Sequence, residues 1–207
     1  VENGPLAEVR FDDQDLREIE YAALLHDFGK VGVREQVLVK ARKLYDKDRD
    51  LVLARFAYVK KSLEAGALER KLRLVTTRGP SASDLATIDE ELRHRIQEID
   101  AHMQFVLASN EPTVLAEGGF ERLRDIAAIR WTDADGVERP LLTPEEVETL
   151  SVRKGSLTVD ERLQIESHVV HTESFLARIP WSRQLRDVPR IAGAHHEKLD
   201  GTGYPRK

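Results

Sequence analysis

Two short stretches carry side chains suited to metal or phosphate chemistry. Residues 22–30 read AALLHDFGK, which sets His26 beside Asp27, and residues 195–205 read HHEKLDGTGYP. An imidazole nitrogen next to a carboxylate oxygen is a typical partial ligand set for a divalent metal ion. The alternative for the first stretch is a surface His-Asp pair at the end of a helix.

Hydrophobic periodicity predicts the element that positions the first pair. Leu16, Ile19 and Ala22 follow helical spacing and predict a helix over residues 16–28 that stops at Gly29. The pair then lies at the buried end of this helix, where polar groups need partners. A short extended link over residues 31–33 and a helical turn over residues 35–39 are expected to follow.

His195 and His196 are predicted to lie on the last helix, which opens near Asp187 and Pro189. Neighbouring residues on a helix point about 100° apart. His195 and His196 are therefore not expected to chelate one ion easily, and are predicted to serve two ions or to flank a pair of them. Asp27 has two carboxylate oxygens and can bridge such a pair of ions.

The two stretches together resemble the HD-GYP family, a subgroup of the HD phosphohydrolase superfamily, over residues 16–40 and 154–206. The resemblance implies a metal-ligand histidine about ten residues after Thr158, which selects His168; a satisfied core histidine is the alternative. The implied metal ligands are His26, Asp27, His168, His195 and His196. The implied cofactors are two or three divalent ions, iron or manganese, and the ligand types also permit zinc.

The implied activity is a metal-dependent phosphodiesterase that hydrolyses cyclic di-GMP to pGpG or GMP. Asp27 and Lys30 are the implied catalytic residues, with Lys30 neutralising charge on phosphoryl oxygens, unless it is only a solvated lysine at a helix end. The resemblance also implies that a loop over residues 201–205 shapes the substrate site or contacts a GGDEF-domain protein. The alternative is a loop with only a structural role. The loop residues are Gly201, Gly203, Tyr204 and Pro205.

Two other functions stay open. One is a catalytically inactive sensor or interaction module, and the other is a different HD-type nucleotide phosphohydrolase. The family also carries a glutamate and a histidine upstream of the HD helix and an aspartate downstream of GYP; residues 1–15 contain no histidine, and the given sequence stops at Lys207. The chain is therefore expected to be a piece of a longer protein with an incomplete ligand set.

The composition excludes several classes of protein. A net charge of −5 disfavours nucleic-acid polymers and anionic membranes as partners. The absence of cysteine excludes disulfides, thiolate zinc sites and a cysteine nucleophile. No apolar run approaches the roughly 20 residues of a membrane span and no signal peptide is visible, which predicts a cytoplasmic protein. Neither a GxxxxGK loop nor a G-x-S-x-G elbow is present.

The domain prediction is a discontinuous, incomplete HD-GYP core, residues 1–40 and 154–207, with an inserted helical arm and connecting segment, residues 41–153. Asp46 or Asp48 is expected to cap a helix to about residue 75, and Ser83 to begin a second helix with heptad-like spacing from Leu85 to Val106. These two helices predict an antiparallel hairpin.

The arm is predicted to mediate a homodimer or to dock a neighbouring domain. The apolar side chains expected to stay exposed for this purpose are Phe56, Tyr58, Ile96 and Met103. An arm folded back on the core as a brace is the alternative.

The predicted fold class is all-α: an HD-domain helical core with an inserted antiparallel helical hairpin. The exception is one small β-hairpin over residues 131–142, where Asp135-Gly136 signals a tight turn. Capping boxes at Thr143 and Thr158 open two further helices, the second running to about residue 179.

Overall fold

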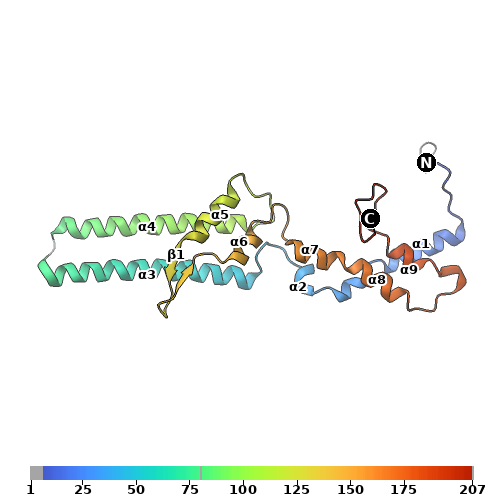
Figure 1. The fold of residues 1–207 in the computed structure, drawn as a ribbon, viewed down its shortest axis with the longest axis horizontal. Helices are drawn as coiled ribbons and strands as arrows, with labels where there is room; N and C mark the ends of the chain where they lie inside the picture. The colour runs from blue at the N-terminus through green and yellow to red at the C-terminus, as the bar shows by residue number, and fades with distance from the viewer. Residues whose placement is uncertain (1–6, 80, 207) are drawn as a thin grey trace. The chain divides into compact units, whose positions relative to one another are not determined.

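The computed structural model describes residues 7–79 and 81–206 and confirms the all-α prediction (Figure 1). The chain divides into two compact units. Unit 1 comprises the residues up to Val39 and from Val159 onward, and unit 2 comprises Lys40–Thr158. Among the described residues, no helix is both long and apolar enough to cross a membrane.

Unit 1 contains the short helices that carry the motif residues. They are α1 (Asp13–Leu25), a 3-10 helix (Phe28–Gly32), α2 (Glu35–Leu38), α7 (Val159–Glu166), α8 (His168–Leu176), a second 3-10 helix (Arg183–Leu185) and α9 (Val188–Ala192). Its core is small: Ala22, Leu176, Val188 and Ala192 are buried together, with Trp181 packed against them. Buried Glu18 joins α1 to the start of α9 by accepting a hydrogen bond from the backbone N–H of Asp187 (2.9 Å).

Several predicted boundaries in unit 1 are wrong. The first helix begins at Asp13, because Asp12 forms a capping box with Asp15, and it ends at Leu25. The expected extended link over residues 31–33 lies mostly within a 3-10 helix. The helix expected over residues 159–179 is two helices separated at Ser167.

Unit 2 is built around the predicted helical hairpin. Helices α3 (Asp46–Arg78) and α4 (Ala82–Ser109) run antiparallel, as Figure 1 shows. Helix α5 (Gly119–Ala128), strands β1 (Arg130–Thr132) and β2 (Glu138–Pro140), and helix α6 (Pro144–Leu150) complete the unit. The strands form the small antiparallel hairpin that the sequence predicted, with Gly136 at φ 81° in its turn.

The core of unit 2 lies at the base of the hairpin. Phe56, Leu123, Ile126 and Leu142 are completely buried there. The prediction of an exposed patch around Phe56, Ile96 and Met103 is therefore wrong: Phe56 is in the core and the other two are partly buried. Tyr58 is exposed as expected, and its ring meets Trp131 edge-on.

Helix caps in unit 2 also differ in detail from the prediction. Tyr45 precedes α3 without a side-chain cap, so Asp46 and Asp48 lie in the first turn instead of capping it. Ser81, and not Ser83, caps α4 through a capping box with Asp84. The predicted box at Thr143 is present, with Pro144 at the first helical position.

Candidate metal centre

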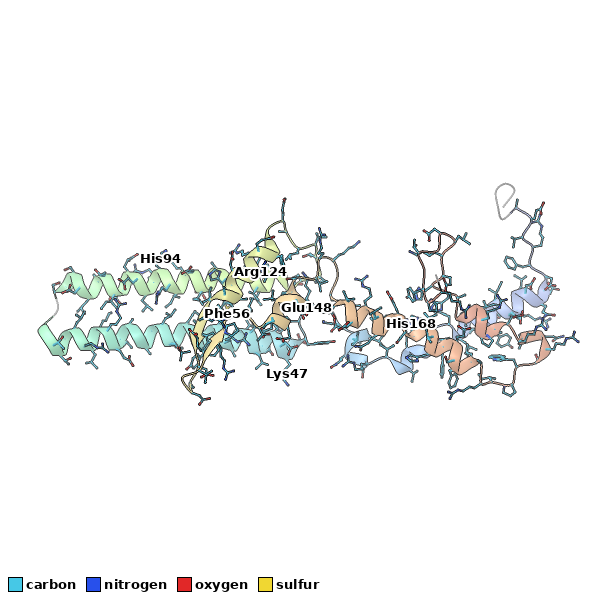
Figure 2. All side chains as sticks on the ribbon, viewed as in Figure 1. Lys47, Phe56, His94, Arg124, Glu148 and His168 are labelled. Atoms are coloured by element: carbon cyan, nitrogen blue, oxygen red, sulfur yellow. The ribbon has the colours of Figure 1, made fainter. Side chains whose placement is uncertain are left out.

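Three separate segments of unit 1 bring the candidate ligands together. His26 is the C-cap residue of α1, and Asp27 follows it directly. His168, labelled in Figure 2, is the first residue of α8 and is 1% exposed. His195 and His196 lie in the turn that follows α9, so the prediction that a helix carries them is wrong.

A close approach between the first 3-10 helix and α8 aligns two of these segments. The N–H of Gly29 donates to Thr172 Oγ1 (2.8 Å), and the same hydroxyl donates to the carbonyl of His26 (2.9 Å). A Cβ atom on Gly29 would lie 1.9 Å from the carbonyl oxygen of His168. Gly29 is therefore required for packing and is not the helix stop that the sequence suggested.

The carboxylate of Asp27 lies between two imidazole rings and a lysine. Its Oδ1 is 3.4 Å from His168 Nε2, and its Oδ2 is 3.2 Å from His26 Nε2. Lys30 Nζ donates to the same Oδ2 at 2.8 Å. The two oxygens thus face different sides of the site, which suits a carboxylate that binds two ions.

Three of the histidines share one hydrogen-bonding pattern. The Nδ1 atoms of His26, His168 and His195 lie 2.6, 2.5 and 2.7 Å from the carbonyl oxygen of the residue three positions earlier. A carbonyl oxygen only accepts, so each Nδ1 carries a proton and donates it. In the neutral ring Nε2 then holds a free lone pair, which is the arrangement that second-shell contacts give metal-binding histidines.

The free nitrogens converge. His168 Nε2 and His195 Nε2 are 3.2 Å apart, so two lone pairs face each other. Two groups of side chains have all their ligand atoms within 4.8 Å of one another: His168, His195 and His196, and His26, Asp27 and His195. His195 belongs to both groups, and each could hold a metal ion.

Adjacent His195 and His196 can serve one ion because they lie in a turn. Their rings are tilted by 47° with centroids 4.2 Å apart. A helix would have directed the two side chains about 100° apart. The expectation that they cannot easily chelate one ion assumed a helix, and the structure has a turn at these residues.

Local electrostatics favour neutral rings at His195 and His196 and an ionised carboxylate at Asp27. Burial lowers the pKa of His195 and of His196, and the neighbouring histidines lower both further. Burial raises the pKa of Asp27, but the hydrogen bond from Lys30 and the charges of His26, Lys30 and His168 outweigh it, so the pKa lies below its ordinary value. Neutral imidazoles and an ionised carboxylate are the forms that bind metal.

The loop after the histidines folds back onto His196. The Tyr204 ring stacks on the His196 ring, with centroids 4.6 Å apart and planes 19° apart. A Cβ on Gly203 would lie 2.4 Å from the carbonyl oxygen of His196, so only glycine fits there. Gly201 has φ 72°, which favours glycine in this turn, and Pro205 is exposed. Burial raises the pKa of Tyr204, and Glu166 and Asp27 raise it further.

Some residues that shape the site carry no sequence motif. Thr172 is completely buried one turn after His168, and only its helical spacing from that histidine could have suggested a role.

Arg190 and Arg206 line a pocket of about 640 Å³ beside His26 and His195, and its other walls are apolar. Nothing in the sequence distinguishes these two arginines from the others. His171 is exposed.

Comparisons with known proteins relate part of the chain to HD domains. Residues 141–207 match the family model described as HD domain. A stretch of 54 residues, 26% of the chain, is 43% identical to 3'3'-cGAMP-specific phosphodiesterase 3 of Vibrio cholerae serotype O1. The chain spans only 11% of that relative's length. No solved structure matches the chain significantly. The match over residues 141–207 and the related stretch support the resemblance seen in the motifs at the level of the HD superfamily.

Proposed function

We propose that unit 1 is the metal-binding core of a phosphodiesterase that hydrolyses a cyclic dinucleotide. The observation that carries the proposal is the pair of facing Nε2 atoms of His168 and His195, 3.2 Å apart, on rings whose Nδ1 protons are already committed to carbonyl oxygens. Two facing lone pairs repel each other unless a cation lies between them or one ring takes up a proton. The lowered pKa of His195 disfavours protonation of that ring.

The residues present fit divalent ions with nitrogen and oxygen ligands. Either His26, Asp27 and His195 or His168, His195 and His196 would hold an ion, because His195 has one free nitrogen and can serve only one of the two groups at a time. Iron and manganese suit imidazole and carboxylate ligands. When bound, such ions supply Lewis acidity toward phosphoryl oxygens and make water a nucleophile at neutral pH.

The side chains of the chain supply orientation and charge. Lys30 fixes the Asp27 carboxylate through their ion pair. Lys30 is also half-exposed, so its ammonium group can approach a substrate phosphate and stabilise negative charge as it develops. Tyr204 covers one face of the His196 ring and limits its rotation.

A cyclic dinucleotide is the substrate class that the surroundings support best. The pocket beside His26 and His195 combines Arg190 and Arg206 with apolar walls. Arginine recognises phosphate, and apolar walls suit a nucleobase. The relative with the matching stretch is named for 3'3'-cGAMP. We therefore propose cyclic di-GMP, opened to pGpG or cleaved to GMP, and 3'3'-cGAMP as the two substrates to compare.

Hydrolysis of both dinucleotides should be measured side by side with protein loaded with Mn²⁺ or Fe²⁺, and the products separated by chromatography. Asp27→Asn should lose metal and turnover together, because the carboxylate belongs to the ligand set. Lys30→Met should keep its metal and lose about 100-fold in rate. Lys47→Met, at an exposed lysine on α3, is the matched control and should keep wild-type metal binding and rate.

A second candidate function is a binding module without turnover. Within residues 7–79 and 81–206, the two ligand groups contain a single carboxylate, Asp27. Binding of metal and dinucleotide with no cleavage of either substrate would support this candidate over the phosphodiesterase. Failure to bind metal at all would overturn both.

The loop that follows His195 and His196, residues 199–205, also has exposed apolar residues that a protein partner could contact. Leu199 is 92% exposed at its start, and Pro205 is exposed at its end. A GGDEF-domain protein as partner stays a prediction, as does a cytoplasmic location, which is where such a partner and a dinucleotide substrate would be met.

A further inference from the structure

Helix α3 carries a second apolar line on the face turned away from α4. The face toward α4 is buried at Val52, Phe56, Val59 and Ala67. The opposite face presents Tyr58, Lys61, Ala65, Leu68, Leu72 and Val75, all exposed. We call these six residues the outer seam.

The outer seam has the spacing of a coiled coil. Its positions are separated by 3, 4, 3, 4 and 3 residues, and five of the six are apolar. Leu68, Leu72 and Val75 are 66%, 64% and 56% exposed. Such a line is unusual on a free surface, and a facing helix of the same spacing would bury it.

We propose that the outer seam binds the outer seam of a second copy of this chain, with the two α3 helices antiparallel. The seam is symmetric about the midpoint between residues 66 and 67. In this register Ala65 therefore faces Leu68 of the second copy, and Tyr58 faces Val75. Every seam position has a partner, and the small Ala65 accommodates the larger Leu68.

The flanking charges favour the antiparallel arrangement. Beside the seam, Glu64 of one copy faces Lys71 of the other, and the same pair repeats across the two-fold axis. A parallel pair would instead set Glu64 against Glu69 of the second copy, and like charges repel. Lys71 already contacts Asp89 of α4 (2.5 Å), so the dimer would join existing ion pairs into a network.

Lys61 is the polar member of the seam. Its side chain is 76% exposed and its ammonium group pairs with Glu64. Opposite Leu72 of the second copy, its methylene groups can cover the leucine while the charge stays in solvent. This proposal rests on unit 2 alone and does not depend on the catalytic one.

The oligomeric state of the 207-residue chain tests the proposal by sedimentation velocity over a range of concentrations. Wild type should dimerise, and Leu72→Glu or Leu68→Glu should weaken the dimer at least 100-fold. Both leucines are exposed and glutamate is a good helix former, so circular dichroism should show a folded chain. Val114→Glu, at an exposed loop position in unit 2, should leave the dimer unchanged.

Single cysteines test the orientation, because the chain has none of its own. Ala65→Cys lies near the proposed two-fold axis and should cross-link with a short bismaleimide. Val75→Cys should not, since the two copies of residue 75 would be about 25 Å apart along the axis. A monomeric wild type, or a dimer unaffected by Leu72→Glu, would overturn the proposal. Cross-linking at Val75→Cys as efficient as at Ala65→Cys would overturn the antiparallel pairing.

Discussion

Gly29→Ala probes the contact that aligns the candidate metal centre. Glycine lets the first 3-10 helix approach α8 so closely that an added Cβ would lie 1.9 Å from His168 O, 2.6 Å from Thr172 N and 2.7 Å from Thr172 Oγ1. Two of these atoms belong to backbone, so no side-chain rotation can relieve the clash. The 3-10 helix must move away from α8.

The cost of that movement can be bounded. Overpacking in a core typically costs about 1–3 kcal/mol, and a clash with backbone belongs at the upper end. Separation also weakens the hydrogen bonds that Thr172 makes with Gly29 and His26, each contributing about 1 kcal/mol. We expect a loss of about 3–5 kcal/mol in the free energy of unfolding of unit 1. Native domains have only about 5–15 kcal/mol in total.

The two tryptophans allow each unit to be followed separately. Trp181 lies in unit 1 and Trp131 in unit 2, and the chain has no others. Urea unfolding monitored by fluorescence in a Trp131→Phe background therefore reports on unit 1. Titration of the same variants with Mn²⁺ by calorimetry measures the site. Gly29→Ala should lower the midpoint of unit 1 and weaken Mn²⁺ binding, since His26 and Asp27 move relative to His168.

Gly66→Ala is the matched control for the same substitution. Gly66 lies within α3, and a Cβ there would meet no atom within 4 Å. Alanine should stabilise unit 2 by about 0.5–1 kcal/mol through helix propensity, measured with Trp131 in a Trp181→Phe background. If Gly29→Ala unfolded at the wild-type urea concentration and bound Mn²⁺ equally well, the close approach would not position the site and our reasoning would be refuted.

Two further predictions concern buried polar groups. Thr172→Val keeps the side-chain volume but leaves Gly29 N–H and the His26 carbonyl without their partner, and should destabilise unit 1 by about 2–4 kcal/mol, measured by Trp181 fluorescence. Burial lowers the pKa of Lys43 below its ordinary 10.5, so the unfolded chain binds this proton more tightly. The stability of wild type relative to Lys43→Met should therefore rise with pH up to about 10.5, and a flat difference in urea unfolding would contradict this.

Local chemistry explains what the sequence predicted well. The two long helices of the arm follow from apolar residues spaced 3 and 4 apart, and the small β-hairpin follows from Asp135-Gly136. The capping box at Thr143 satisfies backbone groups within one helical turn. These features depend on residues a few positions apart, so one chain segment contains all the information.

The motif residues could be named from sequence, but their geometry could not. The HD and HHE patterns pointed to four candidate ligands and the family resemblance to His168, and the structure brings the five together in two overlapping groups. The turn that carries His195 and His196 was not predicted, because α9 ends earlier than its local pattern suggests. That turn decides that both histidines reach the same group.

Tertiary structure alone decided what Gly29, Thr172 and the outer face of α3 do. Gly29 bonds to Thr172 across 143 residues of chain, and nothing near either residue in sequence reveals the other. Phe56 and Leu72 are large apolar residues of the same helix, yet one is fully buried and the other 64% exposed. Burial depends on which segment packs against each face of a helix. A local pattern can show that a face is apolar, but only the folded chain shows whether that face is already covered.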